Sequence, residues 1–251
     1  MIRSPFSLEG KTILITGASS GIGRAAAVEC SRAGAARCVL VARDTIKLNE
    51  TASMLNEHTQ TIICSCDLTD TKSVEAMVAE LPKIDGVLCN AGTNRMKLLP
   101  FISESEIERV FSVNCFSPMI LMKLLVKKKK LNNPSSVVFM ASISGHSNVS
   151  YGNSVYGASK AALSAYMKYA ALELAPKGVR CNAIYPGRVK TPLISSSPVD
   201  EEMVKMDKEK YPLKRYGDPK EIAWAVVYLL SDATSWMTGS DLVIDGGRSL
   251  T

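Results

Sequence analysis

The sequence has few of the residues that build metal sites and disulfide frameworks. Only two histidines occur, His58 and His146, far apart and without the spacing of metal ligands. The seven cysteines are odd in number, include no CxxC pair and lie mostly in apolar runs. We therefore expect no metal site, and we expect buried free thiols in a reducing compartment.

Long apolar runs and strong charge are also missing. No stretch of about 18 apolar residues is present, and residues 1–10 lack the apolar core of a signal peptide. Both absences predict a cytoplasmic protein without a membrane partner. The net charge of +6 is mild and dispersed, which is weak evidence for anionic ligands and argues against nucleic acid as a partner.

Short apolar runs alternate with longer segments of helical pattern. The runs are apolar almost throughout, as is typical of parallel strands covered on both faces. Strands are predicted at 11–16, 38–42, 61–66, 86–90, 136–142, 179–185 and 241–245, and helices at 22–33, 72–81, 104–130, 155–175 and 219–230. This alternation predicts an α/β, doubly wound Rossmann fold, with a seven-stranded parallel sheet and helices on both faces.

No linker or repeat interrupts the pattern, so we expect a single domain over residues 1–251. The segment 188–216, between the sixth strand and the last helix, is long enough for a substrate lid. Met203, Met206 and Tyr211 lie in it, and they are equally consistent with ordinary packing or with a partner surface.

A glycine-rich turn follows the first predicted strand, with three glycines in the sequence TGASSGIG at 16–23. Glycines between a strand and a helix let the backbone approach a pyrophosphate, which the start of the helix attracts. We therefore predict a dinucleotide site, with a ligand-free tight turn as the alternative. The predicted cofactor residues here are Gly17, Ser19, Ser20, Gly21, Ile22 and Gly23.

Arg43 lies about 20 residues beyond the glycines, where the ribose of the dinucleotide is expected. An acid there would accept from a ribose 2′-hydroxyl, whereas arginine pairs with a 2′-phosphate. The sequence therefore favours NADP over NAD as the cofactor. Asp44 is the competing candidate, because a shift of one residue would put a carboxylate at the ribose.

Tyr156 and Lys160 lie four residues apart at the start of a predicted helix, so they share one face. A phenol ionises near pH 10, at about three units above neutrality, and an ammonium beside it lowers that pKa. We predict that Tyr156 exchanges a proton with the substrate. Ser142 ends the fifth predicted strand, where ligands of such sheets bind, and it can hydrogen-bond the reacting oxygen. The alternatives are a solvated helix face for the pair and a capping role for the serine.

Together these motifs resemble those of the classical short-chain dehydrogenases/reductases, over essentially the whole chain. The resemblance includes the glycine turn, Asn90-Ala91-Gly92, Asn114, Ser142, Tyr156-x-x-x-Lys160, Pro186-Gly187, Thr191-Pro192 and the segments 212–217, 238–239 and 245–247. It implies an NADP-dependent oxidoreductase that moves a hydride between nicotinamide and a carbonyl or secondary alcohol. Within the family, the sequence is most similar to 3-oxoacyl-carrier reductases and to hydroxysteroid or sugar-alcohol dehydrogenases.

The resemblance implies a catalytic tetrad of Asn114, Ser142, Tyr156 and Lys160. Ser142 would polarise the carbonyl and Tyr156 would transfer the proton. Lys160 would hold the nicotinamide ribose and lower the tyrosine pKa, and Asn114 would position a water for proton relay. Further cofactor contacts are implied for Asp67, Leu68, Asn90, Ala91, Gly92, Tyr156, Lys160, Pro186, Gly187, Val189 and Thr191.

Two positions depart from the family pattern. The stretch from Ser142 to Tyr156 is about one residue longer than is usual in the family, so Ser144 is an alternative for the serine role. Cys89 stands where a second asparagine is common, and we interpret it as a strand residue rather than a redox thiol.

Partners are only weakly indicated. A run of four lysines at 127–130 ends a predicted helix, where cations complement the helix dipole, and a solvated face is the favoured interpretation. The alternative is an acidic carrier protein, to which Arg95, Lys97 and Lys177 would add contacts. The resemblance implies a small-molecule substrate and a homotetramer or homodimer with the last helix and strand at an interface. A non-catalytic NADP-binding regulator is the alternative function, against which the complete tetrad argues.

Overall fold

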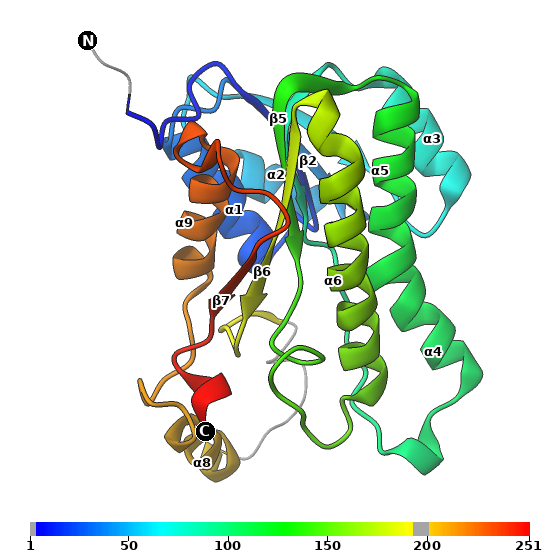
Figure 1. Ribbon diagram of the computed structural model, residues 1–251, viewed down its shortest axis with the longest axis vertical. Helices are drawn as coiled ribbons and strands as arrows, with labels where there is room; N and C mark the ends of the chain where they lie inside the picture. The colour runs from blue at the N-terminus through cyan, green and yellow to red at the C-terminus, as the bar shows by residue number, and fades with distance from the viewer. Residues whose placement is uncertain (1–3, 193–200) are drawn as a thin grey trace.

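Seven parallel strands form one twisted sheet through the centre of the molecule (Figure 1). The computed structural model describes residues 4–192 and 201–251. The strands are β1 (Thr12–Thr16), β2 (Arg37–Ala42), β3 (Gln60–Ser65), β4 (Ile84–Cys89), β5 (Leu131–Met140), β6 (Val179–Pro186) and β7 (Asp241–Ile244). Their order is β3-β2-β1-β4-β5-β6-β7, which confirms the predicted doubly wound Rossmann fold with its seven-stranded parallel sheet.

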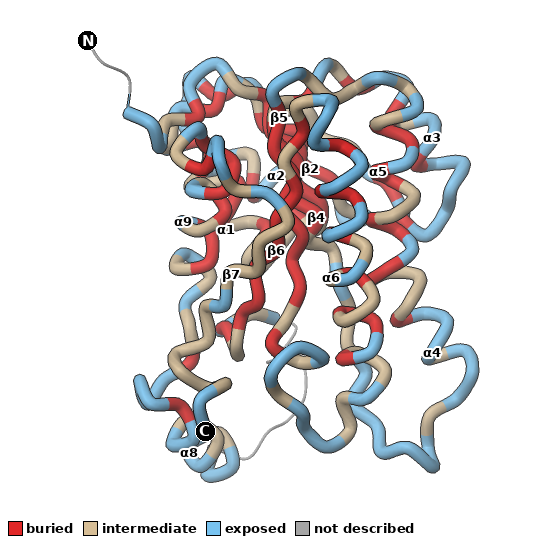
Figure 2. Tube along the Cα trace, in the orientation of Figure 1, coloured by how far each residue is buried: buried red, intermediate tan, exposed pale blue. Residues whose placement is uncertain are grey.

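Helices cover both faces of this sheet (Figure 1). One face carries α3 (Thr71–Glu80), α5 (Ser117–Lys127) and α6 (Ser154–Leu174), and the other carries α1 (Gly21–Arg32), α2 (Thr45–Ala52) and α9 (Pro219–Leu230). Successive side chains of a strand point to opposite faces, so Leu14 joins the first core while Ile13 and Ile15 join the second. The five central strands β2, β1, β4, β5 and β6 are the most deeply buried part of the chain (Figure 2), whereas the edge strands β3 and β7 are only partly covered.

Side-chain caps fix where several helices begin. Asp44 accepts a hydrogen bond from the Lys47 backbone N–H at the start of α2. A capping box between Asp218 and Glu221 starts α9, with Pro219 in its first turn. Helix α2 was not predicted. It has eight residues and buries only Leu48 and Thr51, which is too short a pattern to show helical periodicity.

The helix predicted over 104–130 is interrupted. It consists of α4 (Glu104–Phe111), a π-helical turn (Ser112–Phe116) and α5, and it ends at Lys127. By length and composition alone, the stretch Glu104–Lys127 could cross a membrane, but the core helix of a soluble protein has the same properties. Half of its apolar window is buried, and Leu121, Met122 and Leu125 belong to the core. The stretch is therefore a helix that covers the sheet.

Strand β5 is longer at its start and shorter at its end than predicted. It begins at Leu131 and ends at Met140. The prediction began later because Asn132 and Asn133 interrupt the apolar pattern at the start of the strand. Ser142 therefore lies two residues beyond the strand rather than at its last position.

Gly23 offers a test of how closely α1 packs on the turn that precedes it. A Cβ at this position would lie 2.2 Å from the Gly17 carbonyl oxygen. We expect Gly23→Ala to lower the unfolding free energy by about 2–3 kcal/mol, measured by denaturant titration. In the control Gly217→Ala the nearest atom would be 3.5 Å away, so the change should stay below about 1 kcal/mol. Equal stability of the two variants would contradict this close packing.

Candidate active site

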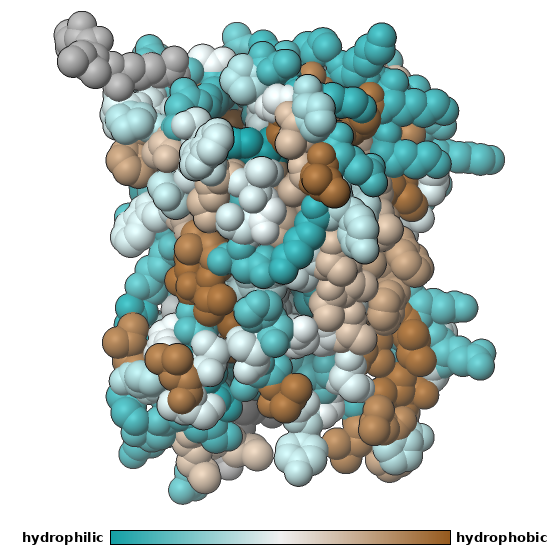
Figure 3. All heavy atoms as spheres, in the orientation of Figure 1, coloured by the Kyte–Doolittle hydropathy of each residue, from teal (hydrophilic) through white to brown (hydrophobic). Residues whose placement is uncertain are grey.

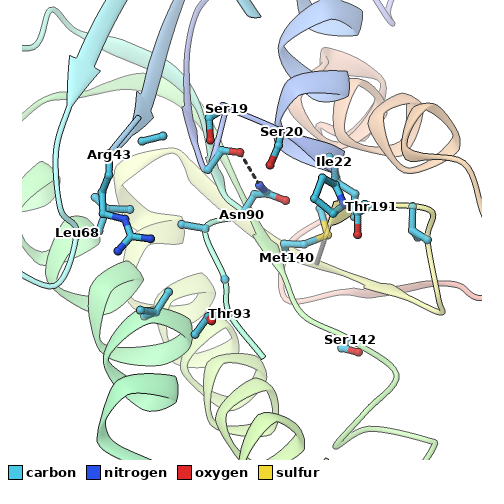
Figure 4. A pocket seen from close by; sticks show the side chains of 18 of the residues that line it. Ser19, Ser20, Ile22, Arg43, Leu68, Asn90, Thr93, Met140, Ser142 and Thr191 are labelled. Atoms are coloured by element: carbon cyan, nitrogen blue, oxygen red, sulfur yellow. Dashed lines mark hydrogen bonds between the residues drawn. The ribbon is translucent and has the colours of Figure 1, made fainter. Parts of the chain in front are cut away.

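A cleft of about 510 Å³ opens at the carboxyl ends of the strands, where doubly wound folds bind ligands. The turn after β1, the ends of β2 and β3 and the loop after β4 form one part of it. Residues after β5, the start of α6 and the segment after β6 form the rest. Ser19 and Ser20 lie near its middle, Arg43 and Leu68 lie at one end, and Ser142 lies at the other (Figure 4).

All but two of the predicted site residues line this cleft. They are Gly17, Ser19, Ser20, Gly21, Ile22, Arg43, Asp67, Leu68, Asn90, Ala91, Gly92, Ser142, Tyr156, Lys160, Pro186, Gly187, Val189 and Thr191. The exceptions are Gly23, which packs against Gly17 instead, and Asn114. Residues outside the predicted set also line the cleft, namely Ala42, Asp44, Lys47, Cys66, Thr69, Thr93, Arg109, Val113, Met140, Ala141 and Pro192.

The glycine turn is shaped by positive backbone angles and by β4. Gly17 and Gly21 have φ of +66° and +54°, a region that favours glycine. Asn90 Nδ2 donates to the carbonyls of Thr16 (3.0 Å) and Gly17 (3.5 Å), the latter drawn in Figure 4. Ser20 caps α1 without a side-chain hydrogen bond, so the helix start presents its N–H groups to an anion.

Asp44 and Arg43 carry neighbouring opposite charges at the far end of the cleft, and their side chains make different contacts. The Asp44 carboxylate accepts from the Lys47 N–H at 3.0 Å and lies 3.6 Å from the Lys47 ammonium. These interactions lower the pKa of Asp44, the backbone hydrogen bond contributing most. The carboxylate is therefore engaged in capping α2. The Arg43 side chain extends into the cleft towards Leu68 (Figure 4).

Lys160 is the most deeply placed charge of the cleft, at 4% exposed. Its Nζ donates to the Met140 carbonyl at 2.7 Å and lies 5.8 Å from the centre of the Tyr156 ring. Burial lowers the pKa of Lys160 to about 8.

The pKa of Tyr156 is shifted in the direction opposite to our expectation. Burial raises it, and a hydrogen bond with Ser142 offsets only part of the rise. Lys160 does not lower this pKa, because its ammonium is directed to the Met140 carbonyl and is itself disfavoured by burial. The phenol is therefore protonated at neutral pH.

Asn114 lies in the π-helical turn and is fully buried. Its Oδ1 accepts from the Thr93 N–H at 2.8 Å, and its Nδ2 donates to the Thr93 carbonyl (2.9 Å) and to Ser159 Oγ (3.0 Å). Both ends of the amide are thus used to join the loop after β4 to α6. This side chain positions the loop, and its expected role in holding a water stays a prediction.

The two departures from the family pattern have simple explanations. Ser142 lines the cleft and bonds with Tyr156, whereas Ser144 does not line it. Ser142 therefore takes the serine position. Cys89 is 4% exposed at the end of β4, and burial raises its pKa, so that it remains a thiol.

The lysines considered for a carrier protein do not form one patch. Lys130 directly precedes β5, and its Nζ donates to the Ala79 carbonyl, while Lys128 pairs with Glu75 at 3.4 Å. These residues lie at the amino ends of the strands, as Lys177 does before β6, while Arg95 and Lys97 follow β4 at the opposite edge. The run at 127–130 is therefore remote from the cleft and partly engaged within the fold.

The segment 188–216 is described only in part, because residues 193–200 lie outside the described residues. Tyr211 is 3% exposed and its hydroxyl accepts from the Arg188 N–H, so it packs within the fold. Met203 and Met206 are exposed on α8 (Glu201–Glu209), which lies beyond the carboxyl end of the sheet near the C-terminus (Figure 1).

Comparison with known proteins decides the family. Residues 17–249 match the family described as enoyl-(acyl carrier protein) reductase. The chain belongs to the classical short-chain dehydrogenases/reductases. It is therefore an oxidoreductase of a family that binds NAD or NADP and acts on small molecules.

Relatives with several substrates share this fold. A 2-keto-3-deoxy-L-fuconate dehydrogenase of Xanthomonas campestris is 34% identical over 96% of this chain and 81% of its own. A 3-oxoacyl-[acyl-carrier-protein] reductase of Rickettsia bellii is 32% identical over 96% and 97%. A solved Agrobacterium tumefaciens structure with bound NADP, described as a 2-deoxy-D-gluconate 3-dehydrogenase, is 29% identical, with a TM-score of 0.89 over 99% of this chain and all of the other.

Burial of Lys160 predicts a stability cost. Because its pKa of about 8 lies below the ordinary 10.5, the buried charge destabilises the fold below pH 8, and this cost disappears as the pH rises through 10.5. We expect Lys160→Met to raise the unfolding free energy at pH 7 by about 2 kcal/mol, after allowing for the lost hydrogen bond. The advantage should shrink by pH 9.5 in denaturant titrations. Exposed Lys123→Met is the control, and a pH-independent effect of Lys160→Met would refute the argument.

Proposed function

We propose that this chain is an NADP-dependent oxidoreductase that interconverts a carbonyl and a secondary alcohol, with Tyr156 transferring the proton. The observation that carries the proposal is the position of Ser142, Tyr156 and Lys160 in the same cleft as the glycine turn. The cleft therefore combines a site for a dinucleotide with groups able to handle a reacting oxygen.

The residues of the cleft fit a nicotinamide dinucleotide. A Cβ on Gly17 would come within 2.9 Å of Asn90 Nδ2, so glycine lets the turn pack on the loop after β4, and the turn leads to the start of α1, where a pyrophosphate would bind. Asp67 and Leu68 would flank the adenine, Lys160 would hold the nicotinamide ribose, and Val189 and Thr191 would meet the amide. When bound, the nicotinamide supplies or accepts the hydride.

The proton chemistry follows from Tyr156 and its neighbours. In reduction, the protonated phenol donates to the carbonyl oxygen while the Ser142 hydroxyl hydrogen-bonds the same oxygen. The transfer leaves Tyr156 as a phenolate, which takes up a proton from solvent before the next reduction. In oxidation these transfers run backwards, and the phenolate takes the proton of the alcohol. The raised pKa of Tyr156 favours the reductive starting state at neutral pH.

Charges at the far end of the cleft favour NADP. Arg43, Lys47 and Asp44 all line it, and the Asp44 carboxylate is engaged in capping α2, so two cations and one capping acid lie at this end. A 2′-phosphate between these cations would form charge-assisted hydrogen bonds.

We also propose a cellular location, an oligomeric state and a substrate lid for this enzyme. Seven free cysteines, six of them buried, support a cytoplasmic protein. Hydrophobic side chains gather over the lower end of α4 (Figure 3), and Trp224 and Tyr228 are exposed on α9, which supports a homotetramer or homodimer. We further propose one catalytic domain, with segment 188–216 closing over the substrate.

Tyr156→Phe tests the catalytic assignment. It should lower the turnover of NADPH with ketones, followed at 340 nm, by about 10²–10⁴-fold, because the proton donor is lost. The affinity for NADPH, measured by fluorescence titration, should change little. Tyr169→Phe, on the exposed face of α6, should retain full activity. Binding of NADPH without turnover of any carbonyl by the unmodified protein would favour the non-catalytic alternative.

Arg43→Leu tests the choice of cofactor. Loss of the guanidinium should raise the Kd for NADPH by about 10–100-fold, the worth of charged hydrogen bonds, while the Kd for NADH changes less than about 3-fold. The matched control is Arg32→Leu on α1, whose guanidinium pairs with Glu29. A protein that already binds NADH more tightly than NADPH would contradict the assignment.

A further inference from the structure

A histidine holds the loop that carries Ser142, from a position outside the cofactor cleft. The His146 ring packs on the Tyr185 ring of β6, with the ring centres 4.4 Å apart and the planes tilted by 48°. His146 Nε2 lies 3.8 Å from Asp241 Oδ2 on β7, and the Tyr185 hydroxyl donates to Asp241 Oδ1 at 2.9 Å. We refer to His146, Tyr185 and Asp241 as the histidine anchor.

One tight turn connects the histidine anchor to Ser142. Three successive backbone N–H groups, at 146–148, donate to the Ile143 carbonyl at 3.0 Å. Ile143 is 4% exposed, and its own N–H donates to the Pro186 carbonyl at 3.2 Å. The turn at 143–148 is therefore fixed to the end of β6 at two points, through the backbone of Ile143 and through the ring of His146.

The same turn sets the orientation of the Ser142 hydroxyl. The Ser144 backbone N–H donates to Ser142 Oγ at 3.1 Å, so the serine accepts from the backbone and keeps its own hydrogen for another oxygen. Gly145 packs on the start of α6, because a Cβ on it would lie 2.1 Å from the Gly157 carbonyl oxygen, one residue after Tyr156. A shift of the turn would therefore redirect the hydroxyl that meets the reacting oxygen.

The charge of His146 is the variable part of the anchor, because histidine ordinarily gains and loses its charge between about pH 5 and 8. The other groups of the cluster keep their state over this range. Burial raises the pKa of Tyr185 to about 12, and its hydroxyl also bonds with Ser164 of α6. Lys168, also on α6, places its Nζ 3.1 Å from Asp241 Oδ2, the same oxygen that His146 approaches.

Two cations therefore share one carboxylate oxygen when His146 is protonated. The Lys168 side chain is 56% exposed, and its flexible stem lets the ammonium move into solvent. The imidazole is held by the turn and by Tyr185, so its pairing with Asp241 draws the turn towards β7. Without its charge, the ring is held by packing on Tyr185 alone.

We propose that His146 is a positioning residue for Ser142, and that its pairing with Asp241 makes the placement of the serine depend on pH. The inference rests on the proposed function, in which Ser142 hydrogen-bonds the reacting oxygen. It adds to that function a regulatory contact between β7 and the loop after β5. The contact is stronger at about pH 5.5 than at about pH 8.

The test is the pH profile of kcat for ketone reduction at saturating NADPH and ketone. Reduction consumes a proton in every variant, so each profile is compared with that of His146→Phe, which keeps the ring and has no charge. The kcat of the unmodified protein should exceed that of His146→Phe by about 2–5-fold at about pH 5.5 and equal it at about pH 8. His146→Ala also loses the ring contact, and its kcat should lie about 3–10-fold below that of His146→Phe at both pH values, with an unchanged Kd for NADPH.

Two further variants change the charges around the imidazole in opposite directions. Asp241→Asn retains an acceptor for the Tyr185 hydroxyl and should abolish the extra activity at acid pH, whereas Lys168→Met removes the competing cation and should enlarge it. The control is His58→Phe, because His58 also lies 3.6 Å from a carboxylate but precedes β3, at the edge of the sheet opposite the cleft. Its profile should match that of the unmodified protein.

Amide hydrogen exchange gives a second readout that needs no turnover. After correction for the intrinsic effect of pH, exchange in the turn at 143–148 should be slower at about pH 5.5 than at about pH 8, and this difference should disappear in His146→Phe. Parallel pH profiles of the unmodified protein and His146→Phe, or a difference that survives Asp241→Asn, would overturn the inference and leave the enzyme assignment standing. If no ketone is reduced, the proposed function fails instead, and hydrogen exchange alone decides whether the charge of His146 holds the turn.

Discussion

The architecture of the site depends on one buried hydrogen bond, from the Lys160 ammonium to the Met140 carbonyl. It holds a positive charge at the end of β5, beside Tyr156 and beneath Gly92, whose added Cβ would lie 3.6 Å from Nζ. An ammonium this deep is unfavourable unless it is paired, and a single backbone carbonyl is modest compensation. The buried ammonium therefore has hydrogens left to donate, and the ribose hydroxyl of the proposed cofactor would accept one of them.

At the other end of the cleft, Arg43 and Asp44 carry neighbouring opposite charges. A sequence that reads Arg43-Asp44 presents two opposite charges where one of them must meet the ribose. Both side chains line the cleft, where the Asp44 carboxylate caps the start of α2 and the Arg43 guanidinium extends towards Leu68. The local rule of helix capping thus fixes where the acid beside Arg43 lies.

The sequence was a good guide where chemistry follows from local pattern, and a poor one where it depends on burial or on loops meeting in space. The apolar runs predicted all seven strands, and the glycine turn and Tyr156–Lys160 pair lie in one cleft. Helix α2 escaped notice because it has so few buried residues. The direction of the Tyr156 pKa shift was wrong because desolvation is invisible in a linear pattern. The hydrogen bond between Asn94 and Asn153 joins two loops and residues 59 positions apart along the chain, so no local sequence motif predicts it.

The π-helical turn at Ser112–Phe116 has a consequence for how this chain can vary. A π-helical turn contains one residue more than an α-helical turn, so it changes the direction in which the side chains of the following helix point around its axis. Removing one residue from it would restore a regular helix and swing the Asn114 amide by roughly 100° around the axis, away from Thr93 and Ser159. The length of this segment is thus as constrained as its composition, and insertions or deletions are expected to be confined to the surrounding loops.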